Sequence, residues 1–229
     1  MENPINYKMQ AATEALRHLK GNVIGLGAGT SIAYLVNLIA ENSSLASALT
    51  FTSSSFKTTN LLIEKGLNVQ TTAYLSEIDV YFDGCDQFDS QLNALKSGGG
   101  IHTNEKILAT MAKEFILIGD YEKYVKQFDL KYPVVIEILP QALKTVSAKL
   151  TQQFPNAVLS LRTSKEKDGA VVSDNGNYLL DVYYKAVPDW ANVNSSIQMM
   201  TGVVEHSLFY GLATKAIIAG NEGINIIEK

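Results

Sequence analysis

The chain has 229 residues, 46% of them hydrophobic, which allows one large globular domain or two small ones. Its formal net charge is −4 and it has no long basic run, which argues against DNA or RNA as a partner. No apolar stretch reaches the ~18 residues of a membrane span, the N-terminus lacks a signal-peptide layout, and the single Cys85 excludes an internal disulfide. We therefore expect a cytoplasmic protein without a membrane or nucleic-acid partner.

Predicted helices and strands alternate over the first 120 residues. Apolar residues at helical spacing predict helices over 6–20, 30–42, 55–66 and 105–115. Short apolar runs predict strands over 22–27, 49–54, 77–84 and 115–120. This alternation is typical of an α/β fold, an open and mostly parallel sheet flanked by helices (Rossmann-like).

After about Asp129 the pattern becomes that of a second, smaller α+β domain. Strands are predicted over 132–139, 157–163 and 178–184, a turn over 174–177, and helices over 140–153 and from about Pro188. Strands over 202–209 and 214–220 are candidates to rejoin the first sheet. We therefore predict a Rossmann-like catalytic domain of residues 1–128 plus 207–229. Residues 129–206 would form the smaller domain, a candidate for oligomerisation.

A glycine-rich loop, Gly25-Leu26-Gly27-Ala28-Gly29-Thr30-Ser31, joins the first predicted strand to the following helix. Backbone N–H groups at the helix N-terminus, with the Thr30 and Ser31 hydroxyls, form a candidate anion site. The alternative is a plain tight turn with Thr30 as the N-cap. The loop lacks both a dinucleotide fingerprint and a Walker lysine, so a small phosphorylated ligand fits best.

Three aspartates lie at the end of the strand predicted over 77–84 or just after it, where open parallel sheets place their ligand crevice. Asp83 and Asp86 could transfer protons, ligate a metal or simply carry solvated charge. No histidine flanks them at ligand spacing, which disfavours a metal, although magnesium on Asp83 and Asp86 stays open. Asp89 is expected to cap a turn or face solvent.

A lysine and three glycines come next, as Lys96-Ser97-Gly98-Gly99-Gly100. The ammonium and the unhindered backbone N–H groups could converge on a developing oxyanion, the alternative being a floppy loop. Glu105 then lies in the first turn of a helix, with Thr103 as a possible N-cap. An isolated glutamate there would be explained by the helix dipole. Beside Asp83, Asp86 and Lys96, we favour a general base.

Two further residues lie next to these motifs. Cys85 has no histidine nearby in sequence to activate it, so we interpret it as a small semi-buried filler rather than a nucleophile. Lys123 follows the strand predicted over 115–120 and is either a surface lysine or a second phosphate contact.

Together these segments resemble the ribose-5-phosphate isomerase A family, and the match runs nearly end to end. The family's GxGTGST loop appears as Gly25–Ser31, its DGADEID as Asp83–Asp89, its K-GGGG as Lys96–Gly100 and its TREK as Thr103–Lys106. Further matches are D-x-x-K at Asp120–Lys123, TDNGN at Ser173–Asn177 and GVVxxGLF at Gly202–Phe209. Several motifs in the right order are far more specific than one glycine loop.

The resemblance implies interconversion of D-ribose 5-phosphate and D-ribulose 5-phosphate in the non-oxidative pentose phosphate pathway, by a homodimer or homotetramer without a cofactor or an essential metal. It implies that Glu105 moves a proton between C2 and C1 through an enediolate. Asp83 and Asp86 would handle sugar hydroxyls and ring opening, and Lys96 would stabilise the enediolate. The other expected substrate-binding residues are Ala28, Gly29, Thr30, Ser31, Gly84, Cys85, Ser97, Gly98, Gly99 and Lys123.

Three positions depart from the family pattern. Ala28 replaces a threonine, which removes a hydroxyl but is expected to leave the backbone donors of the loop. Gln87 replaces a glutamate beside Asp86, and Ser97 replaces the first glycine of the oxyanion loop. Because Glu105, Lys96 and both aspartates are present, we expect an active enzyme. The alternatives are an isomerase of another phosphorylated sugar or a sugar-phosphate sensor without turnover.

Overall fold

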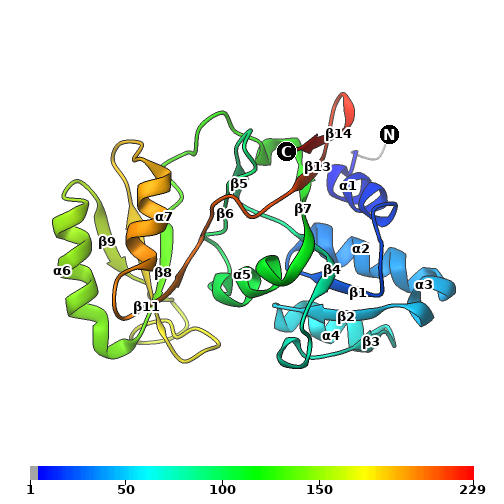
Figure 1. Ribbon diagram of the computed structural model, residues 1–229, viewed down its shortest axis with the longest axis horizontal. Helices are drawn as coiled ribbons and strands as arrows, with labels where there is room; N and C mark the ends of the chain where they lie inside the picture. The colour runs from blue at the N-terminus through cyan, green and yellow to red at the C-terminus, as the bar shows by residue number, and fades with distance from the viewer. Residues whose placement is uncertain (1–4) are drawn as a thin grey trace.

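The computed structural model of the protein describes residues 5–229 (Figure 1). Residues 1–4, which the predicted catalytic domain includes, lie outside the described part. The helices are α1 (Tyr7–Leu16), α2 (Thr30–Glu41), α3 (Ser43–Ala48), α4 (Phe56–Glu64), α5 (His102–Met111), α6 (Leu143–Gln153) and α7 (Trp190–Gln198). Short 3₁₀ turns occur at Thr72–Tyr74, Tyr121–Lys123 and Pro140–Ala142.

The largest sheet has seven strands in the order β14-β13-β7-β4-β1-β2-β3. Their bounds are β1 (Val23–Leu26), β2 (Thr50–Ser53), β3 (Asn68–Val69), β4 (Ile78–Asp83), β7 (Ala112–Asp120), β13 (Lys215–Gly220) and β14 (Gly223–Glu228). Every neighbouring pair is parallel except β13 with β14. The predicted open, mostly parallel sheet is therefore confirmed. The sequence did not indicate β3, which has two residues, or β14, whose residues are mostly exposed at the sheet edge.

Each face of this sheet has its own hydrophobic core, as the alternation of side chains along a strand requires. On one face, Val80 and Phe82 of β4 pack with buried residues of α1, α2 and α4. On the other face, Tyr81 packs with Leu108 of α5. Figure 1 shows α5 between the seven-stranded sheet and the rest of the molecule. This central position lets α5 contact both halves of the chain.

Two smaller sheets complete the fold. One has four antiparallel strands in the order β11-β8-β10-β9, with buried residues of α6 and α7 packed against it. The other has three short strands in the order β12-β6-β5 and lies between the two larger sheets (Figure 1). The bounds are β5 (Gln87–Phe88), β6 (Ala94–Leu95), β8 (Val134–Ile138), β9 (Val158–Leu161), β10 (Tyr178–Tyr183), β11 (Val203–His206) and β12 (Leu208–Phe209). The domain boundaries proposed above stay a prediction.

The strand expected over 202–209 does not rejoin the first sheet. It divides into β11, which pairs with β8, and β12, which pairs with β6. Ser207 lies between the two pieces. Its N–H donates to Val135 O of β8, and its carbonyl accepts from the N–H of Lys96, which follows β6, so its backbone bonds to both smaller sheets. Of the two candidate strands, only the one over 214–220 rejoins the sheet, as β13 beside β7.

Neither of the two candidate N-caps, Thr30 and Thr103, holds that position. Gly29, rather than Thr30, is the N-cap of α2, and Thr30 is its first residue. Helix α5 begins at His102, three residues before the predicted start, with Ile101 as an N-cap that makes no side-chain bond. Thr103 lies inside the helix, and its hydroxyl donates instead to Glu137 of β8. This hydrogen bond links α5 to the four-stranded sheet that contains β8.

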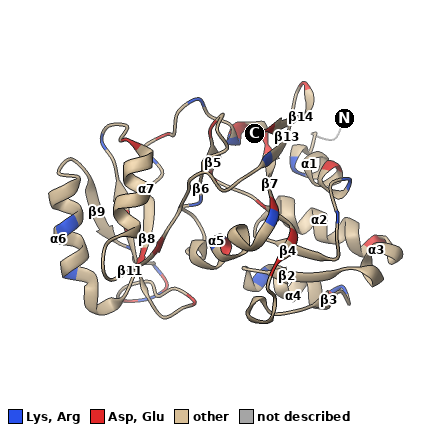
Figure 2. Cartoon of the chain, viewed as in Figure 1, with Lys and Arg blue, Asp and Glu red and all other residues tan. Residues whose placement is uncertain are grey.

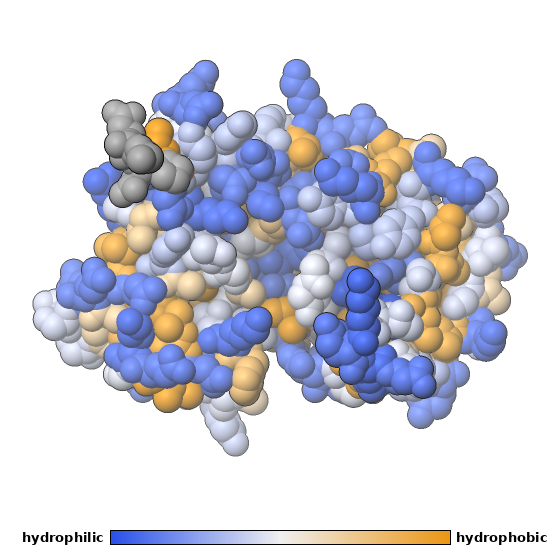
Figure 3. Space-filling model, turned by 180° about the vertical axis from the view of Figure 1, so that it is seen from behind, coloured by the Kyte–Doolittle hydropathy of each residue, from blue (hydrophilic) through white to orange (hydrophobic). Residues whose placement is uncertain are grey.

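Charge and hydropathy are spread over the molecule. Lys and Arg residues are scattered along the chain rather than gathered in one segment (Figure 2). On the face seen in Figure 3, hydrophobic residues form separate patches among hydrophilic ones. Within residues 5–229, no helix combines the length and apolar character needed to span a bilayer.

Candidate active site

A pocket of about 330 Å³ opens at the carboxyl ends of β1 and β4. These strands are neighbours at the centre of the sheet, and the chain leaves them toward opposite edges, the point at which open α/β sheets form a ligand crevice. The predicted site residues that line the pocket are Ala28, Gly29, Thr30, Ser31, Gly84, Cys85, Asp86, Lys96, Gly98, Gly99, Glu105 and Lys123. Asp83 and Ser97 lie behind its wall. Pocket residues that the sequence interpretation did not assign are Lys8, Ile101, Ile118, Gly119 and Asp120.

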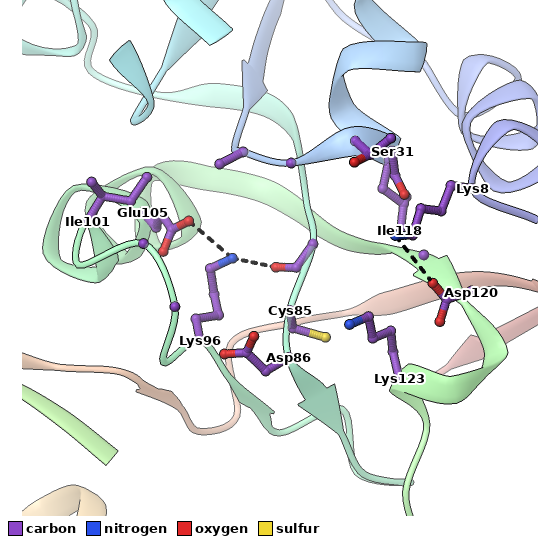
Figure 4. Close-up of a pocket in the computed structure, with 17 residues that line it drawn as sticks. Lys8, Ser31, Cys85, Asp86, Lys96, Ile101, Glu105, Ile118, Asp120 and Lys123 are labelled. Carbon is purple, nitrogen blue, oxygen red and sulfur yellow. Dashed lines mark hydrogen bonds and ion pairs between the residues drawn. The ribbon is translucent and has the colours of Figure 1, made fainter. Parts of the chain in front are cut away.

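Lys96 and Glu105 form an ion pair on one wall of the pocket (Figure 4). Lys96 Nζ lies 3.2 Å from Glu105 Oε1 and 2.9 Å from Asp83 Oδ2, and it also donates to the carbonyl of Gly84. All three side chains are buried. One ammonium is therefore shared between two carboxylates, of which only Glu105 faces the pocket.

This sharing leaves Glu105 easy to protonate. Burial, reinforced by the negative charge of Asp83 and opposed by Lys96, raises the pKa of Glu105 to about 8. Burial alone would lower the pKa of Lys96, but Asp83 and Glu105 outweigh burial and raise it above its ordinary value. At neutral pH the lysine is thus a fixed cation, while Glu105 can both accept and release a proton. This is the property required of a general acid–base.

Asp83 serves as the anchor of the site. Its carboxylate accepts hydrogen bonds from Ala28 N at 3.0 Å, from Gly84 N at 2.7 Å and from the Tyr81 hydroxyl, in addition to the pair with Lys96. Gly27 makes room for it, because a Cβ there would lie 1.9 Å from Asp83 Oδ1. A direct contact with sugar hydroxyls would require Asp83 to exchange these partners. The arrangement therefore favours an action of Asp83 through Lys96.

The opposite end of the pocket is suited to an anion. The N-terminus of α2, with Thr30 and Ser31, points its first N–H groups into the pocket region. Lys123 lines the same end, as does Lys8 of α1, whose Nζ lies 4.0 Å from Asp120 Oδ2 (Figure 4). No motif near Lys8 predicts that it lines the pocket, because it reaches the pocket only through the packing of α1 against the sheet. Asp120 offsets one of the two lysines, and the second lysine with the helix N-terminus leaves this end positive.

Cys85 lines the pocket between the two ends. Burial, opposed by Lys96 and Lys123, raises the pKa of its thiol to about 12. A thiol with such a pKa is protonated at neutral pH and is a poor nucleophile. Its environment thus agrees with the interpretation of Cys85 as a filler.

Comparison with known proteins decides the family. A family model described as ribose 5-phosphate isomerase A (phosphoriboisomerase A) matches residues 50–223. The chain belongs to the ribose-5-phosphate isomerase A family. It is 37% identical to the ribose-5-phosphate isomerase of Sus scrofa over 225 residues, which cover 96% of this chain and 72% of that one. It is 34% identical to the ribose-5-phosphate isomerase A of Pyrococcus abyssi, covering 97% of both chains.

Solved structures of the family agree with the fold. The ribose 5-phosphate isomerase A of Methanocaldococcus jannaschii superposes with a TM-score of 0.88 at 29% identity, covering 97% of this chain and 98% of that one. A D-ribose-5-phosphate isomerase in complex with phospho-erythronic acid gives a TM-score of 0.90 at 33% identity, covering 98% of this chain and all of the other. The fold class and the resemblance seen in the sequence motifs are confirmed.

Ala28 is the first departure from the family's motifs, and its backbone corrects one expectation. Its N–H group donates to Asp83 Oδ1, so it is not free for a ligand. The remaining backbone donors of this glycine-rich loop are the N–H groups of the first turn of α2.

Gln87 and Ser97 have structural partners outside the pocket. The buried amide of Gln87 donates to Asp129 O at 3.1 Å and accepts from Asp129 N at 2.8 Å. A glutamate carboxylate could make only the second of these bonds. Ser97 N donates to Asp86, while its hydroxyl donates to Pro133 O at 2.5 Å, just before β8. Both residues therefore tie the site to the segment that leads into the smaller sheet.

Asp89, the third aspartate of the motif, stands apart from the chemistry of the site. Its carboxylate accepts from Gln91 N and Asn93 N, each at 2.9 Å. It caps a turn, as expected.

Proposed function

We infer that this protein interconverts D-ribose 5-phosphate and D-ribulose 5-phosphate. The observation that carries the inference is the Glu105–Lys96 pair on one wall of a pocket whose far end is positive, in a chain of this family. The pocket volume of about 330 Å³ suits a five-carbon sugar phosphate. Phospho-erythronic acid, bound in one similar structure, carries a carboxylate whose two oxygens resemble those of an enediolate.

Glu105 is proposed as the base that moves the proton. In the open-chain aldose, its carboxylate takes the proton from C2, the C–H electron pair forms the C1–C2 double bond, and O1 gains negative charge. A proton passes from O2 to O1, and Glu105 returns its own proton to C1, which leaves the carbonyl at C2. A pKa of about 8 makes both transfers accessible near neutral pH.

The lysine and the glycine loop would stabilise the charge on the sugar oxygens. Lys96 remains protonated throughout, and Gly98 and Gly99 line the same pocket. Fixed donors of this kind lower the barrier most where charge develops in the transition state. Asp83 holds Lys96 in place, and Asp86, which faces the pocket, is the candidate for proton transfer during ring opening.

The phosphate would bind at the positive end, between the N-terminus of α2 and Lys123. Lys123→Ala is expected to raise KM at least tenfold, because a hydrogen bond to a charged group contributes about 1.5–3 kcal/mol. Lys126→Ala, three residues further on at an exposed position, is the matched control and should leave KM unchanged.

The deciding experiment is conversion of D-ribose 5-phosphate by the purified protein in the presence of a chelator, beside Glu105→Gln. Turnover that is lost in the variant supports both the activity and the base. A folded wild-type protein that binds the sugar phosphate without converting it would contradict the proposal and indicate a sensor. Faster conversion of another aldose phosphate would indicate a different substrate.

The cellular setting belongs to the same proposal. We expect a cytoplasmic homodimer or homotetramer. The edge strand β14 exposes Ile224 and Ile226 to 38% and 39%, which makes it a candidate contact between copies. Light scattering coupled to gel filtration measures the assembly directly, and a monomer at assay concentration would contradict it.

A further inference from the structure

Arg162, on the smaller sheet, grips the glycine loop of the pocket from behind. It directly follows β9, and its side chain reaches across to the loop. Its Nη2 donates to Ser97 O at 2.9 Å and its Nη1 to Gly98 O at 3.1 Å. These carbonyls are consecutive, so one guanidinium fork fixes two successive peptide groups. Neither the sequence motifs nor the pocket lining indicate this residue.

The grip determines where the loop's donors point. In a trans peptide group, the carbonyl of one residue and the N–H of the next point in opposite directions. Holding Ser97 O and Gly98 O on the Arg162 side therefore turns the N–H groups of Gly98 and Gly99 away from Arg162. Gly98 and Gly99 line the pocket, whereas Arg162 does not. The two N–H groups are thus directed toward the pocket.

We propose that Arg162 is a positioning residue that preorganises the Gly98 and Gly99 N–H groups as an oxyanion site. The proposal rests on the isomerase function inferred above, because an isomerase develops negative charge on the C1 and C2 oxygens. Donors that are already oriented need not reorganise during the reaction, which is the main source of such stabilisation.

Asp181 holds the guanidinium in its working orientation. Asp181 Oδ1 lies 2.6 Å from Arg162 Nη2, and both of its oxygens lie 3.1–3.2 Å from Nε. The pairing of β9 with β10 fixes this geometry, since Arg162 N donates to Leu179 O and Asp181 is two residues further on β10. The carboxylate also neutralises the arginine. Arg162 therefore acts on loop geometry rather than by attracting the substrate.

The loop fits closely against this part of the smaller sheet. Gly100 has a φ of +70°, and a Cβ there would lie 2.7 Å from Leu179 Cδ1 and 3.7 Å from Arg162 Nη1. Only glycine satisfies both the backbone conformation and the contact. A lysine at 162 could not replace the arginine, because its ammonium lacks the planar fork that binds two acceptors.

The test compares Arg162→Met and Arg162→Lys with Arg17→Met, a substitution of the chain's other arginine, which is exposed at the C-cap of α1. The measurements are kcat and KM for D-ribose 5-phosphate and the inhibition constants of 4-phospho-D-erythronate and inorganic phosphate. We expect kcat to fall about 10- to 100-fold in both Arg162 variants with KM within about threefold. The loss should be smaller than the roughly 10²–10³ that removal of a donor costs, because the Gly98 and Gly99 N–H groups stay in place and lose only their fixed orientation. The inhibition constant of 4-phospho-D-erythronate should rise in parallel in both Arg162 variants, while that of inorganic phosphate stays unchanged. All four quantities should stay at wild-type values in Arg17→Met.

Chemical rescue separates local geometry from general stability. Guanidinium at millimolar concentration should restore part of the kcat of Arg162→Met and leave Arg17→Met unaffected. If Arg162→Met does not fold, Arg162→Lys decides, because it keeps the charge opposite Asp181 but loses the fork. An unchanged kcat in folded Arg162→Lys, or a loss confined to KM, would overturn the proposal. Lack of turnover in the wild type would instead refute the isomerase function itself.

Discussion

A buried glutamate carboxylate lies on each of two sides of α5, and the two environments shift its pKa in opposite directions. On the pocket side, Glu105 has one ammonium, which it shares with Asp83, and its pKa is raised to about 8. On the side facing the smaller sheet, Thr103 reaches Glu137, a fully buried residue of β8. Thr103 and Glu105 are two positions apart, about 200° around the helix, so they face opposite directions.

Glu137 is kept ionised by neutral donors. Its carboxylate accepts from Ser173 Oγ at 2.7 Å, from Asn177 Nδ2 at 2.8 Å and also from Asn175 and Thr103. Burial raises the pKa of Glu137, but these hydrogen bonds outweigh burial and lower it below its ordinary value. The comparison teaches that burial alone does not decide the charge of a carboxylate. Neighbouring charges, as at Glu105, and hydrogen bonds to the ionised form, as at Glu137, decide it together with burial.

The strongest test of the comparison is catalytic. Glu105→Gln should lower kcat by about 10²–10⁴-fold, the typical contribution of a positioned acid–base. Its neutral amide should keep the fold, because Glu105 is already readily protonated in the wild type. Glu64→Gln, at an exposed position of α4, is the control and should keep full activity. A Glu105→Gln variant with more than a tenth of wild-type kcat would remove Glu105 from the role of base.

Replacing the other glutamate should affect stability first. Glu137→Gln keeps the shape but loses the charge that four side chains donate to, and its amide leaves buried donors unpaired. The free energy of unfolding should fall by about 1–3 kcal/mol. Urea titration of wild type and variant measures this difference. An unchanged midpoint and slope would show that the Glu137 cluster does not support the contact between α5 and the smaller sheet.

The two glutamates should give opposite pH dependences of stability. The folded pKa of Glu105, about 8, lies above its ordinary 4.5, so its contribution is fully present below 4.5 and is lost as the pH rises through about 8. The folded pKa of Glu137 is below 4.5, so its contribution is present above 4.5 and is lost as the pH falls through the lower value. Because Gln resembles the protonated acid, each Gln variant should differ from wild type by a constant unfolding free energy at low pH. As the pH rises, Glu105→Gln should gain stability relative to wild type and Glu137→Gln should lose it, and unfolding titrations across the pH range measure both differences.

Catalysis should follow the ionisation of Glu105. The base is the deprotonated carboxylate, so kcat/KM should rise with pH up to a plateau, with a midpoint near the pKa of about 8. From neutral pH to the plateau this is a gain of about tenfold. Initial rates of D-ribose 5-phosphate conversion across the pH range measure it. A profile that is flat between about pH 6 and 9 would contradict a raised pKa in the free enzyme.

What could be predicted from the sequence is what depends on local segments. Short motifs predicted the alternating helices and strands, the glycine-rich loop at Gly27 and the neighbourhood of Lys96 and Glu105. The sequence also held a signal for the direction of the Asp83 side chain. Tyr81 and Asp83 are two residues apart in β4 and so lie on the same face of the sheet, the face that packs against α5.

Other features depend on how distant segments pack. Arg162 contacts a carbonyl 65 residues away, Glu137 accepts from a threonine 34 residues away, and Lys8 meets Asp120 only through α1. No periodicity or spacing encodes such contacts. For the same reason, the division of the strand expected over 202–209 at Ser207 could not be anticipated, because it follows from bonds to two different sheets.

Ser97 joins the two regions and gives the smallest expected effect. Its N–H donates to Asp86 of the pocket, and its hydroxyl donates to Pro133 O just before β8, the strand of Glu137. Ser97→Ala removes only the second bond, which should cost about 1 kcal/mol of unfolding free energy and change kcat less than threefold. Ser97→Gly, the family residue, should be somewhat less stable because of the added backbone freedom. A kcat loss in Ser97→Ala as large as that expected for Arg162→Met would mean that this hydroxyl, rather than the arginine fork, sets the orientation of the loop.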